Sequence, residues 1–64
     1  ETIGLWAGAV WNALNDANGS LTVKGLKKTT KLKEKEVFAA IGWLAREGKV
    51  NVTEIEKDVE VNLI

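Results

Sequence analysis

The sequence has no cysteine and no histidine among its 64 residues. Without cysteine it has no disulfide framework, and without either residue it lacks the usual ligands of a zinc site. A chain of this length is near the lower limit at which one hydrophobic core holds a fold unaided. We therefore expect packing alone to stabilise the protein, and 45% apolar residues with three Trp and one Phe provide the material.

Tyrosine is absent too, so the commonest general bases and the strongest nucleophile of enzymes are missing. Ser20 has no candidate base near it in the sequence. The sequence therefore predicts a protein that is not an enzyme, that carries no cofactor and that has no evident small-molecule substrate. It also predicts no metal site, because four acids near the C-terminus lack the spacing and the glycine of a calcium loop: Glu54, Glu56, Asp58 and Glu60.

Long apolar runs are missing as well. No stretch approaches the roughly 20 residues of a membrane span, and residues 1–18 lack the basic segment of a signal peptide. We expect a cytoplasmic protein that does not contact a membrane.

The net charge is zero, but it is unevenly distributed. Residues 1–19 carry two acids and no base, residues 20–49 carry eight bases and three acids, and residues 50–64 carry four acids and one base. A basic middle segment is therefore followed by an acidic tail, and the net charge alone says little about partners.

Apolar residues recur with the period of a helix over residues 3–17, and Asn18-Gly19 is a typical helix stop. We expect Trp11 to be a core residue along with Trp6. The apolar face of this helix consists of Ile3, Trp6, Ala7, Val10, Leu14 and Ala17.

Two further helices are predicted, over residues 23–30 and 33–47. Thr22 is a good N-cap for the first, and Gly25 weakens that helix unless packing supports it or a neighbour approaches closely. Lys33 is a poor N-cap for the second, which Gly48 ends. The core stripe of the second helix consists of Val37, Ala40, Ile41 and Leu44, flanked by Leu32 and Val50.

Beyond Gly48 the apolar period changes from 3.6 to 2, which predicts two strands of a hairpin joined by residues 55–58. Ile55 breaks the alternation set by Val50 and Val52, so we expect a bulge or an early turn there. Together with a short first strand near Leu21, the order of these helices and strands predicts an α+β fold. We expect a single winged helix-turn-helix domain over residues 1–64, with three helices and a C-terminal β-hairpin wing.

Two stretches, residues 21–32 and 37–50, resemble a family of small bacterial winged helix-turn-helix proteins of unknown function. The segment Ile41-Gly42-Trp43-Leu44-Ala45-Arg46-Glu47 is the most distinctive part, and the helix from Gly4 to Leu14 with Trp11 is also similar to that family. The resemblance supports the predicted fold and implies no particular activity.

Six lysines fall within twelve residues and form the first candidate site. In related folds, the edge of the helix-turn-helix that corresponds to these residues faces duplex DNA, so the lysine side chains would neutralise phosphates. The other interpretation is an ordinary solvated face, and both remain open. The lysines are Lys24, Lys27, Lys28, Lys31, Lys33 and Lys35.

Base readout is poorly supported. Specific contacts in the major groove favour Arg, Asn, Gln, Ser or Thr on the exposed side of the recognition helix. On the outward arc of the third helix, only Lys35 and Arg46 donate hydrogen bonds, and Arg46 completes the candidate nucleic-acid set. The wing is acidic, and its negative charge would repel the phosphates of DNA.

The same arc predicts an alternative function. Phe38, Ala39, Gly42 and Trp43 would form an apolar patch, and such patches often mark partner surfaces. In the competing interpretation, Phe38 and Trp43 tuck under the wing and the first helix to complete the core. The sequence thus favours a nucleic-acid-binding module of the transcription-regulator type with little base readout. The alternative is a module for protein–protein interaction or homodimerisation.

Overall fold

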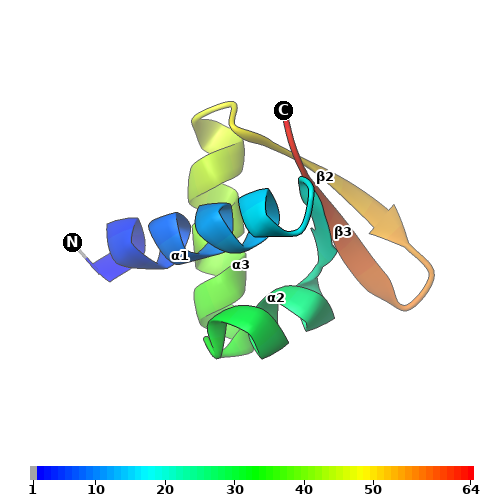
Figure 1. Cartoon of the computed structure of the whole chain (residues 1–64), viewed down its shortest axis with the longest axis horizontal. Coiled ribbons are helices and arrows are strands. Elements are labelled where there is room, and N and C mark those ends of the chain that lie inside the picture. Colours follow the sequence, from blue (N-terminus) through cyan, green and yellow to red (C-terminus); the bar gives the residue numbers. More distant parts are fainter. Residues whose placement is uncertain (1) are drawn as a thin grey trace.

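The computed structural model describes residues 2–64; Glu1, part of the predicted domain, lies outside the described residues. Figure 1 shows α2 and α3 as the helix-turn-helix and the β2–β3 hairpin as the wing, which confirms the predicted α+β winged helix-turn-helix. In chain order the elements are α1 (Thr2–Asp16), β1 (Ser20–Thr22), α2 (Val23–Thr30), α3 (Glu34–Arg46), β2 (Val50–Ile55) and β3 (Asp58–Leu63).

The predicted stop ends α1. Asn18 and Gly19 adopt left-handed backbones with φ of 63° and 93°, and the Gly19 N–H donates to the Leu14 carbonyl at 2.7 Å. This hydrogen bond satisfies one of the carbonyls that the last turn of a helix leaves without a partner. No helix within residues 2–64 has the length and apolarity needed to cross a membrane.

The N-terminus of α2 is capped as predicted. The Thr22 hydroxyl accepts a hydrogen bond from the Gly25 N–H at 3.1 Å. A Cβ atom on Gly25 would lie 3.2 Å from Cδ2 of Leu21, so a neighbour does approach this glycine closely. Gly25 therefore costs helix propensity but leaves room for β1 to pack against α2.

The turn between α2 and α3 is held by hydrogen bonds at both ends. The Thr30 hydroxyl donates to the Leu26 carbonyl at 2.6 Å and accepts from the Leu32 N–H at 3.2 Å. Lys33 is the N-cap of α3, and its own N–H donates to the Glu36 carboxylate at 2.9 Å. Glu36 thus supplies a capping bond that the Lys33 side chain does not make.

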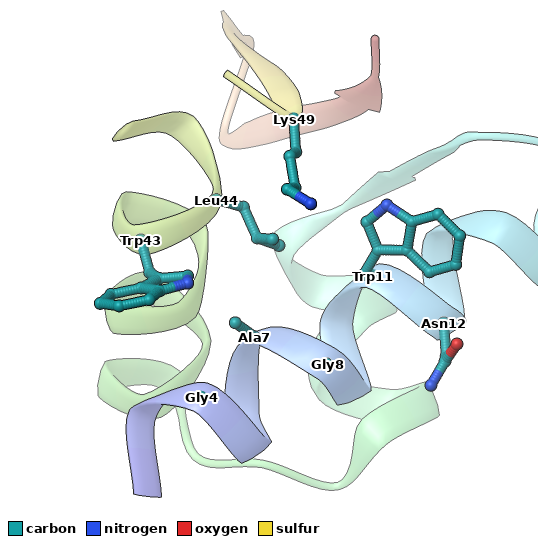
Figure 2. A pocket seen from close by; sticks show the side chains of 8 residues that line it. All are labelled: Gly4, Ala7, Gly8, Trp11, Asn12, Trp43, Leu44 and Lys49. Carbon is teal, nitrogen blue, oxygen red and sulfur yellow. The ribbon is translucent and has the colours of Figure 1, made fainter. Parts of the chain in front are cut away.

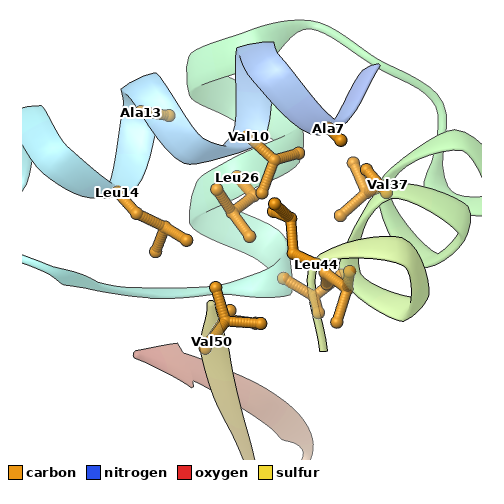
Figure 3. Packing of buried hydrophobic residues seen from close by; sticks show 12 residues of the cluster. Ala7, Val10, Ala13, Leu14, Leu26, Val37, Leu44 and Val50 are labelled. Carbon is orange, nitrogen blue, oxygen red and sulfur yellow. The ribbon is translucent and has the colours of Figure 1, made fainter. Parts of the chain in front are cut away.

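The core lies between the three helices and the sheet, as Figure 3 shows for α1, α2, α3 and the start of β2. The predicted stripe of α3 is buried along its whole length, and Leu32 packs half-buried against it. The largest side chains without solvent contact come from four elements, namely Leu14, Leu26, Val10, Val37 and Val61.

The sheet is antiparallel with the strand order β1-β3-β2, and Val61 on the central strand pairs with both Leu21 and Val52. The predicted bulge or early turn at Ile55 is wrong, because the register is regular as far as the Ile55–Asp58 pair. Alternation places Ile55 on the face opposite Val52, and both side chains stay exposed, at 40% and 47%. The hairpin then closes through a two-residue turn in which Lys57 has a φ of 68°.

The tryptophans of α1 differ from each other. Trp6 is half-buried and packs against the core, as predicted. Trp11 is 38% exposed, so its prediction as a core residue is wrong. The helical angle explains this difference: Trp11 lies at the edge of the apolar face, about 100° from Val10.

Candidate interaction surfaces

The lysines of α2 lie on its solvent face. Val23 and Leu26 turn the opposite face of this helix into the core. Because successive residues are about 100° apart, Lys24 and Lys28 lie away from that core, and Lys27 lies at its edge, about 40° from Val23. Lys24 and Lys28 are exposed and Lys27 is half-buried.

The remaining three lysines of the cluster continue from α2 to the beginning of α3. Lys31 is the C-cap of α2, Lys33 is the N-cap of α3, and Lys35 lies in the first turn of α3; all three are exposed. In Figure 1 this region is the end of the molecule where α2 meets the N-terminus of α3. We call Lys24, Lys27, Lys28, Lys31, Lys33 and Lys35 the lysine surface.

Arg46 does not join the lysine surface. It is exposed near the C-terminal end of α3. It lies eleven positions after Lys35 along the helix, which corresponds to a rise of roughly 16 Å. The predicted nucleic-acid set is therefore split between the two ends of one helix.

The outward face of α3 is apolar and accessible. Phe38 is 43% exposed and Trp43 is 40% exposed, with exposed Gly42 and half-buried Ala39 between them. The interpretation in which both aromatic rings complete the core is therefore wrong, because neither ring is among the side chains that form the core or pack against it.

Two of the acids in the hairpin have partners within the fold. The Glu60 carboxylate accepts a hydrogen bond from the Ser20 hydroxyl at 3.1 Å, and Asp58 accepts from the Val59 N–H at 2.6 Å. Glu54 and Glu56 are exposed. Between residues 2 and 64, these acids form no group of three or more that is arranged to hold a metal ion.

A groove of about 280 Å³ lies between α1 and α3, and Figure 2 shows the indole rings of Trp11 and Trp43 on different sides of it. Of its lining residues, only Trp43 was a predicted site residue. The sequence carried a signal for three of the others, because Gly4, Gly8 and Trp11 are spaced by four and three residues, as on one side of a helix. The lining consists of Gly4, Ala7, Gly8, Trp11, Asn12, Trp43, Leu44 and Lys49.

Comparison with protein families gives a match over almost the whole chain. The model of the winged helix-turn-helix domain (DUF2582) matches residues 1–63. The chain belongs to this family. The resemblance inferred from residues 21–32 and 37–50 and from the first helix is thereby confirmed, and the family is defined by its fold and has no known function.

A solved structure shares this fold. The solution NMR structure of protein BT2368 from Bacteroides thetaiotaomicron is similar to this chain with a TM-score of 0.84 and 34% sequence identity, over 97% of this chain and 74% of the other. No curated protein matches the chain.

Proposed function

We propose that this winged helix-turn-helix domain is a binding module and not an enzyme, and that it binds duplex DNA through phosphate contacts of the lysine surface. The observation that carries the proposal is the placement of all six lysines on α2 and the adjoining end of α3, none of them buried. Within residues 2–64 a single ion pair offsets part of this charge, between Lys27 and Glu34. Lysines that approach phosphates release condensed counterions, and this release drives association.

The proposed binding involves little base readout. On the outward face of α3, Gly42 and Ala39 offer no side-chain donor, and the donors Lys35 and Arg46 lie at opposite ends of the helix. Phosphate contacts position a protein on DNA but carry no sequence information. The expected behaviour is that of a transcription-regulator-type module with low sequence preference.

The hairpin has no part in the proposed contact. Glu54 and Glu56 are exposed on it, and their carboxylates would repel phosphates. The duplex therefore approaches from the side of α2, whereas many winged helices also use the wing.

The test is an NMR titration of the ¹⁵N-labelled protein with a duplex of arbitrary sequence. Amide signals of residues 24–35 are expected to shift at low salt, whereas those of the hairpin stay in place. With four to six phosphate contacts, affinity falls roughly a hundredfold to a thousandfold between about 50 and about 200 mM salt. Unchanged signals from residues 24–35 at the lower salt would refute the proposal.

A second candidate function is protein interaction or homodimerisation through Phe38, Ala39, Gly42 and Trp43, and the exposure of the two aromatic rings supports it. Sedimentation equilibrium at high protein concentration tests the homodimer. Ala39→Glu places a charge in the patch and is expected to dissociate the dimer, whereas Asn51→Glu on the exposed hairpin is not. A wild-type protein that stays monomeric excludes the homodimer.

A further inference from the structure

Two glycines of α1 have no role inside the described fold. A Cβ atom on Gly4 or on Gly8 would meet nothing within 4 Å, whereas one on Gly25 would meet Leu21 at 3.2 Å. Glycine inside a helix costs about 1 kcal/mol relative to alanine. Packing within the chain explains Gly25 but not Gly4 or Gly8, which leave the backbone of α1 open to close approach from outside.

The open backbone lies beside two accessible aromatic rings. Trp11 comes from α1 and Trp43 from α3, and both line the same groove with Ala7 and Leu44 (Figure 2). The groove volume, about 280 Å³, is just below the roughly 300 Å³ at which small-molecule pockets begin. Most of the lining residues are exposed, so the groove is a shallow site suited to the side chains of a docked chain. Tryptophan is enriched among the residues that dominate binding energy at such sites.

Among the described residues that line the groove, Lys49 provides the only charge. Its backbone is held on both sides, because its N–H donates to the Leu44 carbonyl at 2.9 Å and its carbonyl accepts from the Ile64 N–H at 3.1 Å. Figure 2 shows its amine directed towards the space between Leu44 and Trp11. Within residues 2–64 no carboxylate pairs with it. A cation beside two indole rings complements an occupant that carries a carboxylate next to an apolar group.

We infer that the groove between α1 and α3 docks a peptide segment of another protein, which places a large apolar side chain between Trp11 and Trp43 and a neighbouring carboxylate on Lys49. This site is separate from the lysine surface, so the inference of peptide docking holds whether or not the domain binds DNA.

The charge of the groove argues against other macromolecules. A second copy of the chain meeting it face to face would bring two Lys49 ammonium groups together, with no acid among the described lining residues of either copy. Single-stranded nucleic acid stacks on aromatic rings, but it also needs a row of cations along its backbone, and this groove has one.

A displayed library of random dodecapeptides, selected against the chain, tests the inference. Selected sequences are expected to share a large apolar residue next to Asp or Glu, and such a peptide is expected to shift the indole N–H signals of Trp11 and Trp43. Gly8→Leu fills the groove and is expected to weaken binding at least tenfold, or about 1.4 kcal/mol. Lys49→Gln is expected to weaken it about two- to fivefold and to remove the preference for an acid.

Thr29→Leu is the control, because it adds a leucine at an exposed helical position outside the groove. This variant is expected to bind the selected peptides like the wild type, and a cooperative thermal unfolding transition shows that each variant is folded. The inference fails if no peptide is enriched, or if Gly8→Leu retains full affinity. It also fails if concentration-dependent dimers or oligothymidylate, instead of the peptides, shift the two indole signals.

Discussion

The ammonium of Lys27 lies 3.5 Å from the carboxylate of Glu34, and this ion pair joins α2 to the first turn of α3. The two side chains are 41% and 65% exposed, so the pair contributes at most about 1 kcal/mol to stability. Its larger effect is on the lysine surface, where Glu34 places a negative charge among six positive ones.

Glu34→Gln is therefore expected to raise affinity for duplex DNA about fivefold at about 50 mM salt, because one repulsive charge is removed and Lys27 is released. The same change costs less than about 1 kcal/mol of stability, since it removes an exposed pair and a favourable charge at a helix N-terminus. Fluorescence anisotropy measures the affinity. Glu47→Gln, an equal change beyond the far end of α3, is the control; an equal gain from that variant would show that only net charge matters.

Thr22→Ala is expected to destabilise the fold by about 1 kcal/mol, because the Gly25 N–H loses its capping acceptor at the start of α2. Urea unfolding followed by tryptophan fluorescence measures the change. Thr29→Ala, at an exposed position of the same helix, is the control and should change stability by less than about 0.5 kcal/mol. Equal effects of the two substitutions would contradict the capping role.

Gly42→Ala is expected to stabilise the protein by up to about 1 kcal/mol, since alanine is the better helix former and its Cβ meets nothing within 4 Å. Gly25→Ala is expected to gain less or to destabilise, because its Cβ crowds Leu21 at 3.2 Å. Thermal unfolding of both variants checks this difference. A larger gain at Gly25 than at Gly42 would contradict the close packing of β1 on α2.

Much of this fold was predictable because its signals are local. The buried stripe of α3 follows from the spacing of Val37 and Leu44, and the cap of α2 follows from the type of residue at position 22. Asn18 and Gly19 tolerate left-handed backbones, which is why they mark the end of α1.

The two wrong predictions concern Ile55 and Trp11, apolar residues whose type favours the core but whose place in the strand or helix leaves them exposed. Ile55 was expected to need a bulge because an apolar residue seemed to belong on the buried face. The regular ladder instead leaves Ile55 exposed, and the backbone of Lys57 closes the turn. Trp11 was expected in the core along with Trp6, although its helical angle places it at the margin.

The groove was not predictable because it depends on how two helices cross. Helical periodicity places Gly4, Gly8 and Trp11 on one side of α1, but it does not bring Trp43 of α3 or Lys49 beside them. The lysine surface was identified from the sequence, since its residues lie close together in the chain. The distance of Arg46 from it follows from the length of α3.

The salt dependence of duplex binding, measured by anisotropy with labelled DNA, tests the proposed function most directly. A plot of log K against log salt concentration is expected to have a slope between about −3.5 and −5.5, for four to six phosphate contacts. The double substitution Lys24→Gln and Lys28→Gln is expected to make the slope shallower by about 1.8. A slope near zero, or one that this double substitution leaves unchanged, would contradict binding through the lysine surface.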